Sequence, residues 1–77
     1  MKTLLAIDDE LSVREAYRLI LSDRYRVLLA PDGATALRLM RENHVDLILL
    51  DMVMPAMGGM EVLDEIVKLD SLIPVIV

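Results

Sequence analysis

The feature that most constrains the fold is a run of four apolar residues, Leu47 to Leu50, that ends on the carboxylate of Asp51. A run without a polar break is typical of a strand that is buried on both faces, as in a parallel sheet. In open α/β sheets the carboxyl ends of the strands border the ligand crevice. We therefore expect Asp51 at a rigid position that faces solvent.

Apolar runs alternate with amphipathic segments along the whole chain. Three further strands are predicted at Thr3 to Ile7, Tyr25 to Ala30 and Ile73 to Val77, and helices at about Leu11 to Ser22, Gly33 to Glu42 and Met60 to Leu69. Strands and helices that alternate with short connections imply right-handed crossovers and a parallel sheet with helices on both faces. The predicted fold class is α/β, in a single domain that spans residues 1–77.

Local signals place the helix ends and one inward face. Ser12, followed three residues later by Glu15, predicts a capping box at the first helix, and Asp32 predicts an N-cap at the second. The apolar positions of the first helix follow a helical spacing and are expected to face the sheet: Val13, Ala16, Tyr17 and Ile20.

Composition excludes several classes of function. Seventy-seven residues without cysteine allow one small domain and no disulfide framework. The formal charge of -5 disfavours a nucleic-acid partner, because binding to phosphates relies on clustered Lys and Arg. No apolar run approaches the roughly 20 residues of a membrane span, and the start of the chain is too short for a signal peptide. We expect a cytoplasmic protein that binds neither membrane nor nucleic acid directly.

Acidic residues follow two of the predicted strands. Asp8, Asp9 and Glu10 come directly after the first strand, and Asp51 follows the third. If these strands are neighbours, Asp8, Asp9 and Asp51 meet at one edge of the sheet and repel one another unless a cation lies between them. Mg²⁺ is the natural candidate, and a carboxylate beside it could attack phosphorus as a nucleophile.

Other readings of the charged residues stay open. The acids after the first strand could merely lie at the N-terminus of the next helix, where the helix dipole stabilises negative charge. Asp46 is expected to be solvated at the opposite edge of the sheet, His44 to be a solvated helix end, and Arg14 and Arg18 to lie on the outer face of the first helix.

Three motifs resemble the receiver domain of two-component response regulators: AIDDE after the first strand, LILLDMVMPAMGG around the third and PVIV in the fourth. The resemblance implies a flavodoxin-like sheet with strand order 2-1-3-4. It implies that Asp51 is the phosphoacceptor, Asp9 a direct Mg²⁺ ligand, Asp8 a ligand acting mainly through water, and the backbone carbonyl of Val53 a further ligand. The phosphoryl donor would be a phosphohistidine on a sensor histidine kinase, and the domain would be a phosphoacceptor rather than an enzyme.

The chain also departs from that family. Receivers commonly carry Asp or Asn at the position of Gly58, and they carry a Ser or Thr and a Lys in parts that would follow Val77. The chain thus resembles a receiver truncated after the fourth strand, without the last helix, strand and helix. We expect it to form a homo-oligomer through the exposed last strand and the uncovered sheet face. The alternative function is a self-assembling half-domain that keeps the acidic pocket but has no phosphotransfer activity.

Overall fold

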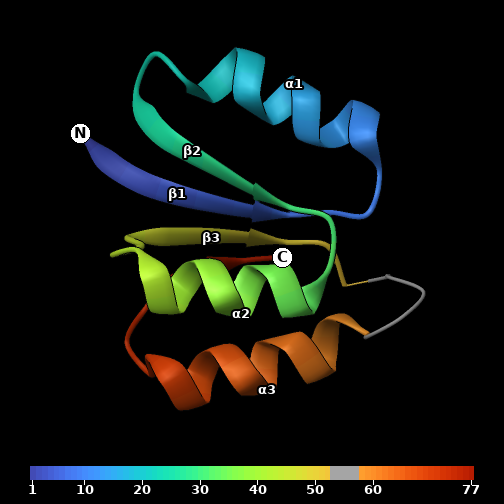
Figure 1. Ribbon diagram of the computed structural model, residues 1–77, viewed down its shortest axis with the longest axis vertical. Coiled ribbons are helices and arrows are strands. Elements are labelled where there is room, and N and C mark those ends of the chain that lie inside the picture. The colour runs from blue at the N-terminus through green and yellow to red at the C-terminus, as the bar shows by residue number, and fades with distance from the viewer. Residues whose placement is uncertain (53–57) are drawn as a thin grey trace.

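The computed structural model describes residues 1–52 and 58–77 as a three-layer arrangement of helices around one sheet (Figure 1). Strands and helices alternate along the chain: β1 (Lys2–Ile7), α1 (Leu11–Leu21), β2 (Tyr25–Ala30), α2 (Gly33–Glu42), β3 (Leu47–Leu50), α3 (Gly59–Leu69) and β4 (Val75–Ile76). The four strands are parallel and lie in the order β2-β1-β3-β4. The α/β class and the predicted strand order 2-1-3-4 are therefore confirmed.

One face of the sheet carries the main hydrophobic core. The register pairs Leu5 with Ile48 and Ile7 with Leu50, so these four side chains point to the same side. All four are buried, and they pack with Val62 and Ile66 of α3 and with residues of α2. This aliphatic core fixes the relative positions of β1 and β3, the two strands that precede the acidic residues.

The other face is covered by α1, which packs on β2 and β1 (Figure 1). Every residue of α1 is at least partly exposed, and Ile20 is 72% exposed. The prediction that Ile20 faces the core was wrong. Helical periodicity identifies an apolar stripe on α1, but it does not show how much of that stripe the sheet beneath covers. On the same face, Leu49 of β3 is only half-buried, and its neighbour Ile76 of β4 is 55% exposed.

The helix caps agree only in part with the sequence. The Asp32 carboxylate accepts a hydrogen bond from the Thr35 N–H at 2.7 Å, which confirms it as the N-cap of α2. The capping box at Ser12 was wrong, because α1 begins at Leu11, its N-cap is Glu10 and that cap makes no side-chain hydrogen bond within the described residues. The predicted partner Glu15 instead pairs with Arg18 along the helix.

The fourth strand is shorter than predicted. It covers Val75–Ile76 rather than Ile73 to Val77. Pro74 cannot donate to a ladder, although its carbonyl accepts a hydrogen bond from the Ile48 N–H at 3.0 Å. The missing donor explains why regular pairing begins only after the proline.

Candidate functional site

The acidic site is built at the carboxyl ends of β1 and β3. The last residues of these strands, Ile7 and Leu50, are direct partners in the register, so Asp8 and Asp51 follow at the same level. The backbone holds both of them: the Asp51 N–H donates to the Ile7 carbonyl at 2.9 Å, and the Asp8 N–H donates to the Ala30 carbonyl of β2 at 3.1 Å. The sheet itself therefore positions both acids.

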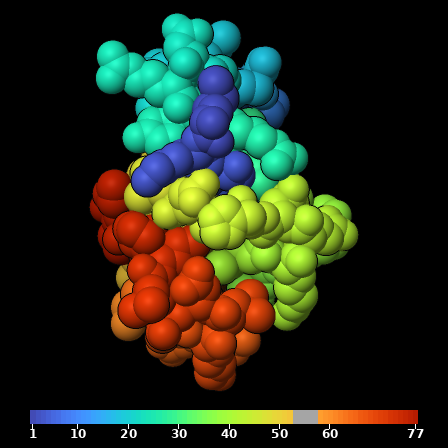
Figure 2. Space-filling view, turned by 90° about the vertical axis from the view of Figure 1, so that its left-hand side faces the viewer, coloured from blue at the N-terminus to red at the C-terminus, as the bar shows by residue number. Residues whose placement is uncertain are grey.

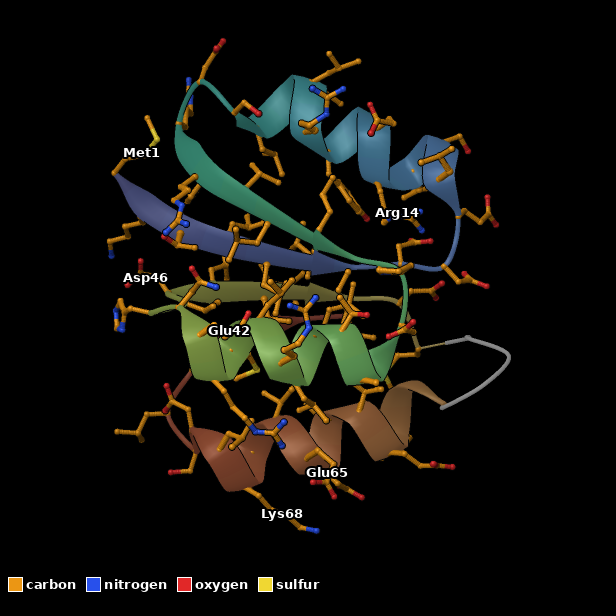
Figure 3. All side chains as sticks on the ribbon, viewed as in Figure 1. Met1, Arg14, Glu42, Asp46, Glu65 and Lys68 are labelled. Atoms are coloured by element: carbon orange, nitrogen blue, oxygen red, sulfur yellow. The ribbon has the colours of Figure 1, made fainter. Side chains whose placement is uncertain are left out.

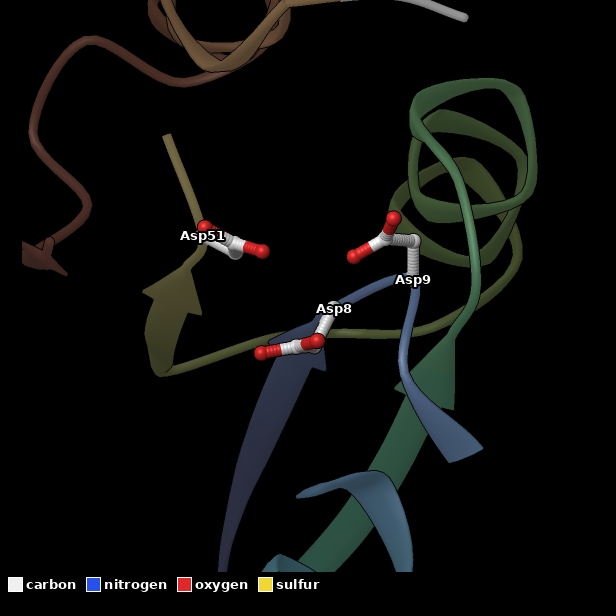
Figure 4. A group of neighbouring side chains, drawn as sticks. All are labelled: Asp8, Asp9 and Asp51. Carbon is white, nitrogen blue, oxygen red and sulfur yellow. The ribbon is translucent and has the colours of Figure 1, made fainter. Parts of the chain in front are cut away.

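The structure brings together the three carboxylates that the sequence pattern singles out. One oxygen from each of Asp8, Asp9 and Asp51 lies within 4.8 Å of the others, and the side chains converge from the ends of the two strands (Figure 4). Asp8 is buried at 8% exposure, Asp51 is half-buried and Asp9 is exposed. The site is thus open to solvent on the side of Asp9. Val53, whose carbonyl was a predicted ligand, lies outside the described residues.

Asp8 is also held by contacts from the loop and from α1. Its Oδ1 accepts a hydrogen bond from the Glu10 N–H at 2.9 Å, and its backbone carbonyl accepts one from the Arg14 guanidinium at 2.8 Å. Arg14 therefore does not simply lie on the outer face of α1, as predicted, but reaches back toward the acidic residues. Sequence spacing carries no signal for this contact, because it depends on the path of residues 8–10.

The chemistry of the donor set fits a hard divalent cation. All three side chains offer carboxylate oxygens, which are the ligands that Mg²⁺ prefers. Two oxygens on opposite sides of an octahedral Mg²⁺ lie about 4.2 Å apart, since each bond is about 2.1 Å long. A group whose oxygens lie within 4.8 Å is close to that size. The donor set and its spacing are therefore compatible with such an ion.

The acidic site opens into a hollow of about 450 Å³ on the α1 side of the sheet. Its polar end is formed by Asp8, Glu10 and Asp51, and its apolar wall includes Tyr17 and Ile76. A ligand at the carboxylates would therefore contact both charged groups and the partly uncovered sheet face.

A different acid occupies the opposite edge of the sheet. The Asp46 carboxylate accepts hydrogen bonds from the Thr3 N–H at 2.8 Å and lies 2.9 Å from Nε2 of His44. The Thr3 hydrogen bond, with a smaller contribution from His44, holds the pKa of Asp46 below its ordinary value. Asp46 is thus not merely solvated, as predicted, whereas His44 is 86% exposed as expected for a solvated helix end. In Figures 2 and 3 the start of the chain lies beside the segment that leads into β3.

The structure also bears on the membrane prediction. Among the residues that it describes, the helices are all too short or too polar to cross a membrane.

Comparison with known proteins gives one consistent family. Residues 4–77 match the model of the response regulator receiver domain. The response regulator MprA of Mycobacterium sp. (strain KMS) is 39% identical over 75 residues, which cover 96% of this chain and 33% of that protein. The chain thus spans about a third of the length of the curated relatives it matches.

Solved structures resemble the chain over nearly its whole length. The chemotaxis protein CheY4 of Vibrio cholerae superimposes with a TM-score of 0.93 at 32% identity, covering 97% of this chain and 65% of CheY4. The response regulator TrrA of Thermotoga maritima, in complex with Mg²⁺ and BeF, gives a TM-score of 0.89 at 34% identity, covering 97% of this chain and 66% of TrrA. TrrA has also been solved in complex with the histidine kinase ThkA. By sequence and by fold, this chain belongs to the receiver domain family of two-component response regulators.

Proposed function

We propose that this chain is the phosphoacceptor module of a phosphorelay, in which Asp51 receives a phosphoryl group from a phosphohistidine of a sensor histidine kinase. The observation that carries the proposal is the convergence of Asp8, Asp9 and Asp51 within 4.8 Å at the strand ends. The solved complex of the similar protein TrrA with a histidine kinase supports the choice of donor. The module would act in the cytoplasm, and its charge of -5 argues against direct contact with nucleic acid.

The proposed step is a transfer between two nucleophiles. A carboxylate oxygen of Asp51 attacks phosphorus in line with the bond to the imidazole nitrogen. An O–P bond forms, the P–N bond breaks, and its electron pair stays on the imidazole, which leaves as the unmodified histidine. The product is an acyl phosphate on Asp51. The chain acts as a phosphoacceptor and not as an enzyme in the usual sense.

The three acids together would hold the cation that such a transfer needs. Asp9 and Asp51 are the proposed direct ligands of Mg²⁺, Asp8 acts mainly through water, and the backbone carbonyl of Val53 completes the proposed set. When bound, Mg²⁺ neutralises the charge on the carboxylates and on the phosphoryl oxygens. The buried position and hydrogen bonds of Asp8 support its role as a fixed part of this site.

The test is the intact mass of the chain after incubation with a small phosphoramidate donor, with and without Mg²⁺. We expect a mass increase of one phosphoryl group that requires Mg²⁺ and is lost in Asp51→Asn. Asp46→Asn is the matched control, since it removes an acid from the opposite edge of the same sheet. An adduct that persists in Asp51→Asn, or no adduct in the folded chain, would contradict the proposal.

A second candidate function is self-assembly, which the exposed apolar residues beside the hollow favour. Ile76 and Val77 are 55% and 72% exposed, and they lie at the edge of the sheet on the side of the half-exposed Leu49. We propose that two copies of the 77-residue chain cover this face or pair their β4 strands around a two-fold axis. Sedimentation should then show a dimer at micromolar concentration that Ile76→Lys dissociates. A compact, cooperatively folded monomer would refute it.

A further inference from the structure

The contact between α1 and the loop after β1 takes no direct part in the proposed phosphoryl transfer. Arg14 lies in the first turns of α1, and its guanidinium donates to the carbonyl of Asp8, six residues earlier, at 2.8 Å. Figure 3 places Arg14 on the side of α1 that faces the sheet edge. The Arg14 backbone N–H donates to the Glu10 carbonyl at 3.1 Å. The backbone bond is an ordinary helical hydrogen bond, so the contact specific to the Arg14 side chain is the one to the Asp8 carbonyl at the start of the short turn formed by residues 8–10.

That turn determines how two of the three carboxylates are presented. Asp8 is held at three points: its N–H donates to the Ala30 carbonyl, its Oδ1 accepts from the Glu10 N–H, and its carbonyl accepts from Arg14. Asp9 lies between Asp8 and Glu10, so its direction follows from the same backbone path. A change in the turn would move the carboxylates of Asp8 and Asp9 relative to Asp51, whose backbone N–H is fixed by the Ile7 carbonyl of β1, before the turn begins.

We propose that Arg14 is a positioning residue for the cation site: through the Asp8 carbonyl it keeps the carboxylates of Asp8 and Asp9 aligned with Asp51. This inference rests on the cation site of the proposed function. A charge-assisted hydrogen bond is among the stronger ones a protein makes, and groups that orient metal ligands typically change metal affinity by 10-fold to 100-fold when they are removed.

The positive charge of Arg14 has the opposite effect, because it repels a cation. The two effects can be separated, since added salt screens the repulsion but leaves a direct hydrogen bond nearly intact. Arg18 provides the matched control. It lies one turn further along the same helix and carries the same charge, but it pairs with Glu15 and not with the loop.

The test is a Mg²⁺ titration of the wild-type chain and its variants in about 0.5 M NaCl, followed by amide NMR shifts. We expect the Kd for Mg²⁺ to rise about 10-fold in Arg14→Ala, to stay unchanged in Arg18→Ala and to rise less in Arg14→Lys, which keeps one donor. Hydrogen exchange of the Glu10 amide, whose acceptor is the Asp8 carboxylate, should accelerate in Arg14→Ala, less in Arg14→Lys, and not in Arg18→Ala.

The outcomes separate this inference from the function on which it rests. If the wild-type chain binds Mg²⁺ and folded Arg14→Ala binds it equally well or more tightly, the positioning role is wrong and the proposed function stands. If Arg14→Ala lowers the melting temperature but leaves the Kd for Mg²⁺ unchanged, the positioning role is also wrong and the proposed function stands. If the folded wild-type chain does not bind Mg²⁺, the cation site of the proposed function fails, and the role of Arg14 fails with it.

Discussion

The two edges of the sheet use the same side chain in opposite ways. At the amino end of β3, the Asp46 carboxylate lies between the Thr3 N–H and the His44 ring. At the carboxyl end, Asp8, Asp9 and Asp51 face one another within 4.8 Å. The Asp46 carboxylate faces donors on two sides, whereas the other three carboxylates lie close to like charges, although Asp8 also accepts from the Glu10 N–H.

This difference separates an acid that holds the fold together from acids that are available for chemistry. Asp46 ties β1 to β3 with a side-chain hydrogen bond, and its backbone N–H also donates to the Thr3 carbonyl at 2.8 Å. The clustered acids are expected to repel one another until a cation binds among them. A substitution at the amino edge should therefore change stability, and one at the carboxyl edge should change ligand binding.

The largest expected effect is a loss of stability at the carboxyl edge, where the preceding contrast leads us to expect changes in ligand binding. It arises because this edge also contains a tight structural contact. A Cβ added to the buried Gly59 would lie 2.2 Å from the Cα of Met52, the residue after Asp51. Gly59→Ala should destabilise the fold by about 3 kcal/mol, since backbone must move to make room. Urea unfolding measures the change.

The neighbouring glycine is the control for this prediction. A Cβ on Gly58 would meet no heavy atom within 4 Å in the part of the chain that the structure describes. Gly58→Ala should therefore change stability by less than about 1 kcal/mol, the range of backbone entropy effects alone. Equal losses in the two variants would show that α3 does not press on the Met52 backbone.

The next effect separates stability from binding at the acidic cluster. Asp9→Asn removes one of the like charges, so it should raise Tm slightly when EDTA is present. With Mg²⁺ at ten times its Kd, binding should add about 1.4 kcal/mol to wild-type stability, and the variant should lose most of this gain. Thermal unfolding with EDTA and with Mg²⁺ measures both effects. Asp64→Asn, on the exposed side of α3, is the control for loss of one negative charge. A stability gain from Mg²⁺ that survives in Asp9→Asn would contradict the assignment of Asp9 as a Mg²⁺ ligand.

A smaller effect concerns the acid at the amino edge. The Thr3 hydrogen bond lowers the pKa of Asp46 from its ordinary value of 3.8, so the ionised carboxylate stabilises the folded state above that pH. Its contribution is lost as the pH falls through the folded-state pKa. Asp46→Asn should therefore be less stable than wild type at pH 7, and the two should converge well below pH 3.8.

Chemical unfolding between pH 2 and pH 7 checks this prediction. The exposed Asp23, in the turn after α1, gives a matched loss of charge without the Thr3 contact. A constant difference between wild type and Asp46→Asn across the range would show that ionisation of Asp46 is not what stabilises the strand pair.

The same comparison explains which features could be read from the sequence. The alternation of apolar runs and helical stripes predicted the α/β class and, with the motifs, the strand order. Asp8, Asp9 and Asp51 could be grouped in advance because the carboxyl ends of neighbouring parallel strands share one edge. This argument needs only the order of the strands and no side-chain geometry.

The contacts that sequence reasoning missed depend on register and on the path of single turns. Asp46 binds the backbone of Thr3, which is 43 residues away, only because β1 and β3 pair in one specific register. Arg14 reaches the Asp8 carbonyl only because residues 8–10 turn back toward α1. The exposure of Ile20 depends on which strands α1 covers. Periodicity contains none of this information.

The smallest expected effect combines helix capping and added charge at one position, the N-cap of α3. Gly58 has an extended backbone (φ -62°, ψ 153°) and open space around it, so a side chain there can accept from the first turn of the helix. Gly58→Asn should stabilise the fold by about 0.5 kcal/mol through capping and reduced entropy of the unfolded chain.

Gly58→Asp offers the same cap but adds a negative charge at the edge that already carries three carboxylates. In EDTA the Asp variant should therefore gain less than the Asn variant, and Mg²⁺ should narrow the gap between their unfolding midpoints. If Asp is the more stabilising of the two without Mg²⁺, attraction to the helix dipole outweighs repulsion from the cluster, and the contrast between the two edges is weaker than their geometry indicates.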